Sequence, residues 1–243
     1  MKAKLGAYTL WQLRDFFFER AVAILVILGL FIWAEYAQTG IARASTFVAE
    51  GGVHALQFGA AVMGALLAES WPLCALIAIY GISANDRTTG RFRLMFAKPA
   101  SVVGYYARAF VVQGAAFMLC VAIGIAAFSR VFPLSGLAAS SALVIYAVSY
   151  LLVGGVCFLF SAIWRFDWVS TGAVLGAALY LASRFPDSPW LGPLPPFWKI
   201  SQQIDLIRTL DPLDPKPLLW VAAYGIACFL LGLIILKRRP LAT

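Results

Sequence analysis

Long runs of apolar residues alternate with short polar segments along the whole chain. A helix needs about 20 apolar residues, each rising about 1.5 Å, to cross the hydrocarbon core of a bilayer. Six runs reach or approach this length, at residues 21–38, 53–84, 109–128, 137–164, 168–183 and 218–236. The pattern predicts an all-α integral membrane protein with six transmembrane helices, in a single domain over residues 1–243.

The stretch before the first run has an amphipathic pattern. Between residues 5 and 19, Gln12, Asp15 and Glu19 recur at three- and four-residue spacing, opposite an apolar face. This spacing predicts an N-terminal helix that lies at the membrane interface. The alternative is that the stretch extends the first span into the cytoplasm.

Residues 184–217 contain eight of the 12 prolines of the chain, so they do not form one regular helix. Apolar residues at helical spacing occur inside this stretch, at Phe197, Ile200, Ile204 and Ile207. We expect an external re-entrant or amphipathic segment between spans five and six, with Trp190 and Trp198 at headgroup depth. An ordinary structured loop is the alternative.

Basic residues set the orientation, because cytoplasmic loops carry an excess of Lys and Arg. With both termini in the cytoplasm, 13 of the 19 basic residues lie inside: Lys2, Lys4, Arg14, Arg20, Arg87, Arg91, Arg93, Lys98, Arg108, Arg165, Lys237, Arg238 and Arg239. The outside keeps Arg43, Arg130, Arg184, Lys199, Arg208 and Lys216. The sequence therefore predicts a multi-pass inner-membrane protein with both termini cytoplasmic.

The composition agrees with a membrane protein and argues against a soluble domain or a nucleic-acid-binding protein. Charged residues make up 12% of the chain and hydrophobic residues 62%, whereas a soluble domain has about 25% charged residues. The net charge of +8 follows from the orientation bias, so we expect no nucleic-acid partner. All four cysteines fall inside apolar runs and are expected to be buried hydrophobic residues.

Motifs for membrane-embedded catalysis are missing from the sequence. His54 is the one histidine, and the chain has no HExxH, GxSxG or Walker GxxxxGK[ST] motif. We therefore expect no catalytic residue, metal site or cofactor in this chain.

Glu69 is the clearest acid within an apolar run, and Pro72 follows three residues later. A carboxylate in the bilayer costs a few kcal/mol, so its side chain should face protein or water. Glu69 is therefore a candidate for a translocation path or a proton site. A carboxyl group hydrogen-bonded to a neighbouring span is the alternative.

Gly172 and Gly176 form a GxxxG pattern in the fifth run. Small residues at this spacing allow two helices to approach closely, which makes the pattern a candidate dimer seam. Packing within one subunit is the alternative.

The segment between runs two and three, residues 85–101, mixes basic and large apolar side chains. The residues of interest are Arg87, Gly90, Arg91, Phe92, Arg93, Leu94, Met95, Phe96, Lys98 and Pro99. Apolar knobs flanked by basic residues suit a protein interface with an acidic rim. A loop whose charges only fix the orientation would not need Phe, Met and Phe among them, although it is the remaining alternative.

This layout resembles the permease subunit of a type-2 ABC exporter. That family carries, after its second span, a signature close to acidic–basic–x–x–Gly–Thr–Leu–x–x–Leu–Leu–x–x–Pro–x–Ser–Arg. The matching residues are Asp86, Arg87, Gly90, Phe92, the apolar run 94–96, Pro99 and Ser101, with Tyr105 and Tyr106 as the following aromatics. Arg91 stands where Thr is usual and Val102 where Arg is usual.

The resemblance implies a coupling helix at residues 85–101 that docks on a separate cytoplasmic ABC ATPase. ATP and Mg²⁺ would bind to that ATPase, and a second copy or a sister permease would complete the translocation path. Two other functions stay open from the sequence. One is a membrane anchor or assembly subunit that transports nothing, and the other is a secondary carrier that uses Glu69.

Overall fold

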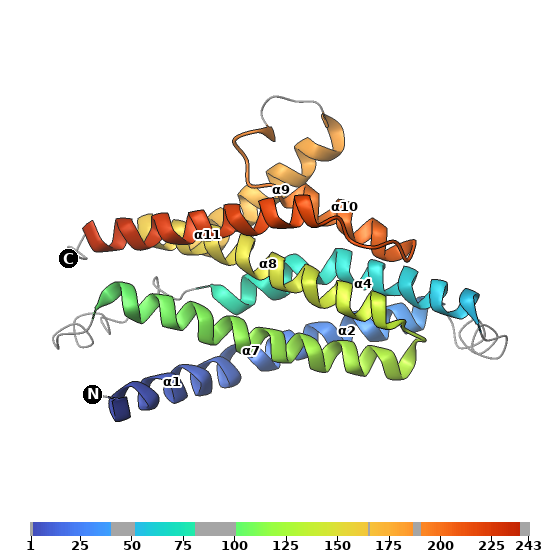
Figure 1. Cartoon of the computed structure of the whole chain (residues 1–243), viewed down its shortest axis with the longest axis horizontal. Helices are drawn as coiled ribbons and strands as arrows, with labels where there is room; N and C mark the ends of the chain where they lie inside the picture. Colours follow the sequence, from blue (N-terminus) through green and yellow to red (C-terminus); the bar gives the residue numbers. More distant parts are fainter. Residues whose placement is uncertain (1, 40–51, 81–100, 165, 187–190, 239–243) are drawn as a thin grey trace.

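The structure is a computed structural model that describes residues 2–39, 52–80, 101–164, 166–186 and 191–238. Its elements are helices that pack side by side along one long axis (Figure 1). In chain order they are α1 (Lys2–Phe16), a π-helical turn η1 (Phe17–Ala21), α2 (Val22–Thr39), α4 (Val53–Ile79), α7 (Val102–Val131), α8 (Gly136–Ile163), α9 (Asp167–Arg184), α10 (Phe197–Arg208) and α11 (Pro215–Arg238).

Within the described residues, five helices are long and apolar enough to cross a membrane. They are Thr9–Thr39, Val53–Ile79, Val102–Val131, Gly136–Ile163 and Pro215–Arg238. Five of the six predicted runs lie in these helices, although residues 81–84 of the second run lie outside the described residues. The helices mostly extend past the apolar runs, because polar residues at a helix end do not stop it.

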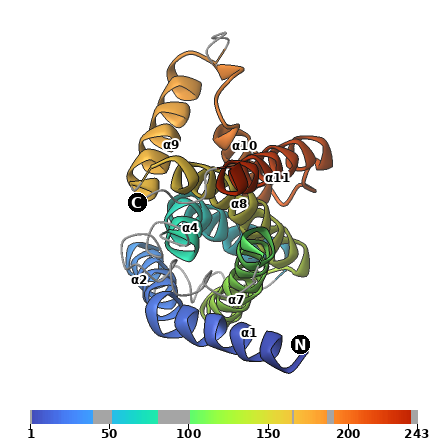
Figure 2. The ribbon, with the colours of Figure 1, turned by 90° about the vertical axis from the view of Figure 1, so that its left-hand side faces the viewer.

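The predicted span at 168–183 forms α9, which is not among these five helices. α9 has 18 residues and is bounded by Asp167 and Arg184. At about 1.5 Å per residue it rises about 27 Å, short of the roughly 30 Å hydrocarbon core. Figures 1 and 2 show that α9 leans away from the other helices.

The first helix runs without a break from α1 through η1 into α2, since Phe16 and Val22 on either side of η1 keep right-handed helical backbone angles. α1 and α2 thus form one continuous helical segment, and the location of residues 5–19 at the membrane interface stays a prediction. At η1 the helix changes direction, and α1 crosses beside α7 (Figure 2).

The π turn keeps the buried face of the first helix in one direction. Buried side chains recur every four residues, at Gln12, Phe16, Arg20, Ile24 and Leu28. In an α-helix of 3.6 residues per turn, each such step drifts by about 40°, or roughly 160° over the whole stretch. A π turn places one extra residue in a turn, which takes back about 100° of that drift. The stripe therefore continues to face α4 and α7.

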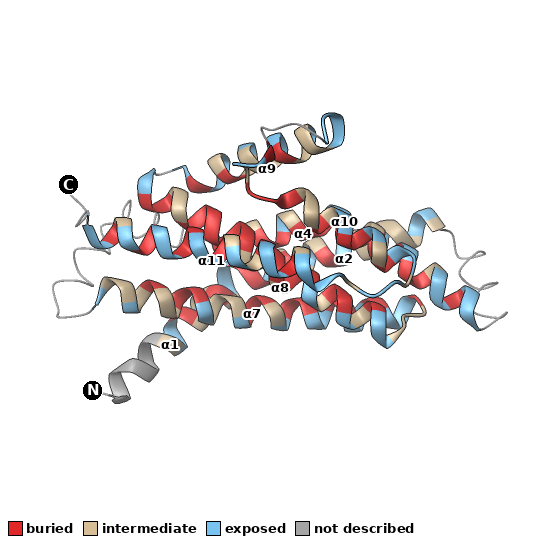
Figure 3. Ribbon diagram, turned by 45° about the horizontal axis from the view of Figure 1, so that its top comes forward, coloured by how far each residue is buried: buried red, intermediate tan, exposed pale blue. Residues whose placement is uncertain are grey.

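α8 is the central helix and contacts α4, α7, α9, α10 and α11. α8 approaches α11 most closely where both helices have glycine. A Cβ on Gly155 of α8 would collide with the carbonyl of Gly225 on α11, so only glycine fits at this contact. Two buried hydrogen bonds join it to other helices: the Ser70 and Tyr146 hydroxyls lie 2.6 Å apart, and Tyr150 donates to the Phe110 carbonyl at 2.6 Å. Figure 3 shows the buried positions on the inward sides of these helices.

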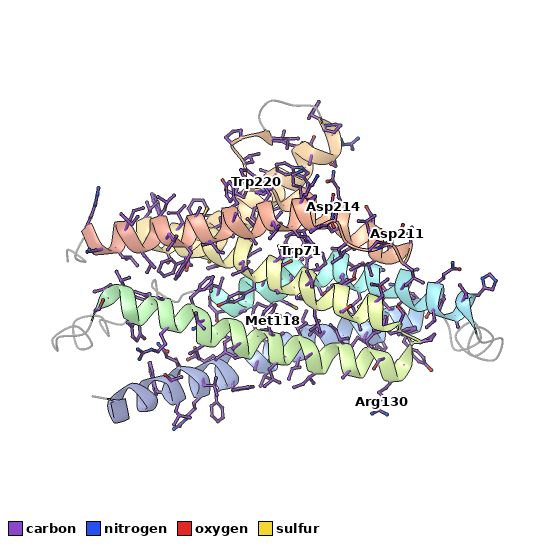
Figure 4. The ribbon with its side chains drawn as sticks, viewed as in Figure 1. Trp71, Met118, Arg130, Asp211, Asp214 and Trp220 are labelled. Atoms are coloured by element: carbon purple, nitrogen blue, oxygen red, sulfur yellow. The ribbon has the colours of Figure 1, made fainter. Side chains whose placement is uncertain are left out.

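α10 packs into the bundle, against α4, α8, α9 and α11. Its buried positions are Phe197, Ile200, Gln203, Ile204 and Ile207, which confirms the helical spacing read from the sequence. The Phe197 ring stacks on Trp71 at 6.3 Å between centroids, and Trp71 lies inside the bundle (Figure 4). Trp198 is partly buried against the core, and Trp190 lies outside the described residues.

The two ends of the bundle carry different parts of the chain. The start of α1, the end of α4, the start of α7 and the end of α11 lie at one end (Figure 1). Arg130 and Asp211 lie near the opposite end (Figure 4). α9 and α10 together return the chain to that opposite end, so that α11 can run back toward the end that holds the first residues of α1.

Candidate functional site

The predicted docking residues, from Arg87 to Pro99, lie outside the described residues, which resume at Ser101. The Ser101 side chain accepts a hydrogen bond from the Gly104 amide at 3.3 Å and caps the start of α7. Tyr106 is fully buried, with its ring 5.8 Å from that of Phe158 on α8. The predicted docking segment is therefore followed by a capped helix that is anchored in the core.

Arg20 forms a buried polar junction at the same end of the bundle. Its Nη1 donates to the Ala78 carbonyl at 2.8 Å and to Gln113 Oε1 at 3.0 Å, and its Nη2 donates to the Tyr80 carbonyl at 2.9 Å. The guanidinium also lies over the Tyr80 ring, 5.3 Å from the centroid. One side chain of the first helix therefore holds the last turn of α4 and a side chain of α7.

The negative potential that faces Arg20 at this junction comes from the carbonyl groups at the end of α4. Arg20 is only 6% exposed, and no described carboxylate lies within ion-pair distance of it. The last carbonyls of a helix have no partner within the helix and carry the negative end of its dipole. Arg20 supplies donors and a positive charge to these carbonyls, so each group satisfies the other.

Glu69 lies on the exposed side of α4. Glu35 on α2 interacts electrostatically with both Glu69 and Arg208 of α10. The stem of Arg208 lies directly over Gly64 of α4, where any larger residue would displace it. Arg208 also forms an ion pair with Asp205, with Nη1 3.0 Å from Oδ1.

We call Glu35, Glu69, Asp205 and Arg208 the charged face. It combines three acids with one base on three elements, of which α4 contacts both α2 and α10. Glu35 is only partly buried and Glu69 is exposed, so both carboxyl groups reach the surface of this chain. A face of this kind can hold a proton or attract a cation, because two nearby carboxylates favour sharing a positive charge.

The sequence indicated Glu69 but not its neighbours. Glu35 stands close to the end of its apolar run, where an acid is ordinary, and Arg208 belongs to the external stretch. No local pattern places α10 against α4. The glycine at position 64 was the available signal, since a small residue in a membrane helix marks a close approach.

Gly172 and Gly176 face open space, since no atom of the described residues lies within 4 Å of a Cβ built on either one. The structure thus gives no support to the alternative in which they pack within one subunit. α9 and α10 also flank a half-open pocket of about 410 Å³, lined by Leu179, Ser183 and Trp198 among others.

Within the described residues, no group of three or more His, Cys, Asp or Glu side chains is arranged to hold a metal ion. The four cysteines, Cys74, Cys120, Cys157 and Cys228, are buried free thiols, as their positions in the sequence predicted.

No protein-family profile matches this chain, and no curated protein or solved structure matches it. The fold therefore defines the class. In the part of the chain that the structure describes, five long apolar helices, α8 at their centre, make this an all-helical, multi-pass membrane protein.

Proposed function

We propose that the chain is the membrane-spanning subunit of an ATP-driven exporter of the type-2 ABC class. A separate cytoplasmic ATPase docks on residues 85–101, and ATP and Mg²⁺ bind to that ATPase. Both termini lie in the cytoplasm, and α9 with α10 completes a sixth crossing. The translocation path forms between this chain and a second copy or a sister permease.

The carrying observation is the signature segment itself, from Asp86 to Ser101. It connects the end of α4 to the start of α7, at the end of the bundle where α1 begins and α11 ends. An ATPase that docks there would contact the chain at the cytoplasmic ends of α4 and α7. Apolar knobs such as Phe92 and Phe96 would fill its groove, while Arg91 and Arg93 would meet an acidic rim.

The charged face and the exposed GxxxG pattern, Gly172 and Gly176, support a translocation path between this chain and a partner subunit. Glu69 and Glu35 reach the surface of the chain, although acids in membrane helices normally face protein or water. Gly172 and Gly176 leave space for close approach of another helix. Partner subunits that cover these features would shield them from lipid.

The test is purification of the native complex from its own membrane in mild detergent. We expect a co-purifying ATPase with vanadate-sensitive hydrolysis. Phe92→Ala and Phe96→Ala should release it, since buried interface anchors commonly contribute about 2 kcal/mol or more. Membrane insertion should stay normal. A stable complex with no ATPase would instead support an anchor or assembly subunit.

One observation favours a second candidate, a secondary carrier. The Glu35 carboxyl group interacts with that of Glu69, and intramembrane acids often mark ion or proton pathways. Uptake into vesicles that is driven by an ion gradient without ATP, and is lost in Glu69→Gln, would identify the carrier.

A further inference from the structure

The half-open pocket between α9 and α10 has a volume of about 410 Å³. Small-molecule sites in proteins have roughly 300–1,000 Å³, and most of them are apolar with a few polar groups that orient the ligand. The apolar part of this lining comes from Leu179, Ala182, Leu191 and Trp198. The pocket is therefore large enough for a small amphiphilic molecule or for part of a longer one.

Three polar side chains also line the pocket, namely Ser183, Ser201 and Gln202. The Ser183 hydroxyl donates to the Tyr180 carbonyl at 2.8 Å, which leaves its oxygen able to accept a further bond. The side chains of Ser201 and Gln202 have no hydrogen bond within the described residues. Polar groups without partners are costly away from water. The lining thus suits a ligand that itself carries hydrogen-bonding groups.

The pocket lies at a depth that belongs to the bilayer. α10 begins beside Trp71 of α4, on which Phe197 stacks, and its last residue, Arg208, lies over Gly64. Trp71 is 18 residues from the start of α4 and eight from its end, or about 27 and 12 Å along the helix. A hydrocarbon core of about 30 Å that began at either end of α4 would include this level. Because α9 leans away from the other helices (Figures 1 and 2), a ligand reaches the pocket from the lipid phase.

The lining is also uncharged, since no described residue that lines the pocket is acidic or basic. Arg184 and Lys199 each directly follow a lining residue in the sequence, but one residue turns a helix by about 100°, and neither belongs to the lining. The acid of α10, Asp205, is paired with Arg208 at 3.0 Å. A charged ligand group would therefore find no counter-charge in the pocket, and burying it would be costly.

We propose that the pocket between α9 and α10 binds a neutral amphiphile from the bilayer, with its apolar part against Trp198 and an uncharged head bonded to Ser201 and Gln202. The head is a hydroxyl, ester or amide group, which can both use and satisfy these side chains. The bound molecule also completes the packing of α9, in which three of the 18 residues are buried. This site does not depend on an ATPase and goes beyond the proposed function.

The experiment uses the full chain in phosphatidylcholine nanodiscs. The probe is a monoacylglycerol with a photoactivatable diazirine in its acyl chain, and mass spectrometry of peptides locates the label. We expect label on the lining residues of α9 and α10, and excess monoolein should displace it. Probes with the same chain and a carboxylate or trimethylammonium head should label these residues at least about tenfold less, because their charge has no partner there.

Ala182→Phe fills the pocket and should lower the displaceable label about tenfold, since overpacking such a space is costly. Ala177→Phe is the matched control, because Ala177 is exposed on the same helix and does not line the pocket. It should label like the wild type.

Gln202→Leu removes a partner of the head and should lower labelling by the monoacylglycerol about tenfold. Labelling by a diazirine alkane, which has no head, should stay unchanged. Because Gln202 is exposed, this variant decides the question if Ala182→Phe does not fold.

Equal displaceable label in Ala182→Phe and Ala177→Phe would overturn the site. Label spread alike over the exposed sides of the other helices would also overturn it, because it would mark ordinary contact with lipid. Label that appears only after copies of the chain dissociate would show that a second copy fills the pocket, which is a third contrary result. Equal labelling by the charged probes would reject the neutral class of ligand.

Discussion

The carbonyl oxygen of Gly225 on α11 occupies the space where a side chain of Gly155 on α8 would begin. The two backbones therefore touch directly, in the most extensive helix pair of the bundle. In a membrane, helix association depends on such close packing, because lipid is as apolar as the side chains and provides no hydrophobic driving force.

Gly155→Ala should destabilise the folded chain by about 1–3 kcal/mol, the usual cost of overpacking a core. The obstacle is backbone, which cannot rotate away as a side chain can. Unfolding in a mixed detergent series measures the free energy. Gly29→Ala is the control, because no atom lies within 4 Å of a Cβ on Gly29. Equal stability of the two variants would contradict this contact.

Topology is testable with single introduced cysteines. Asp211→Cys should react with an impermeant thiol reagent added outside intact cells, and Lys237→Cys should react only after the membrane is opened. Both positions are exposed, and they precede and end α11. The native cysteines are buried and should not react with the reagent. The reverse labelling would reject the proposed orientation.

The charged face predicts a functional effect of Glu69→Gln without loss of assembly. If the carboxyl group lies on the path, transport or stimulation of the ATPase should change in complexes of normal yield. Glu35→Gln should have an effect in the same direction, and the double variant should be non-additive because the two groups interact. A lower melting temperature with unchanged activity per folded complex would show that Glu69 serves packing only.

The basic residues of the docking segment should act differently from its phenylalanines. Arg91→Ala and Arg93→Ala remove rim charges, which mainly set the association rate and its salt dependence. They should weaken ATPase binding more at low salt than at high salt. Association rates measured across a salt series are the readout. If these two variants and both phenylalanine variants bind normally, the segment only fixes the orientation.

The sequence predicted the long helices well, because bilayer thickness sets a length that an apolar run must meet. It predicted few of the contacts between these helices. The buried stripe of α10 was visible in the spacing of Phe197 to Ile207, but its partner α4 was not, since no local pattern encodes a contact between distant segments. The run at 168–183 predicts a full span, but α9 also includes Asp167 and Arg184 and is less apolar as a whole than the five long helices.

The two polar sites show the same limit. In the sequence Arg20 is one of many basic residues predicted to lie on the cytoplasmic side, and nothing local distinguishes a buried arginine from an exposed one. η1 was also invisible, since residues 17–21 contain neither Gly nor Pro. Such a turn forms where tertiary contacts favour it, here the bonds between Arg20 and the end of α4.

The π turn makes the first helix sensitive to a kind of mutation that substitution scanning does not sample. Relative to a plain α-helix, η1 is a one-residue insertion. Deleting a single residue between positions 17 and 21 would let the helix become regular, and would rotate everything before it by about 100° and draw it in by about 1.5 Å. Chain length within this stretch is thus as important as residue identity.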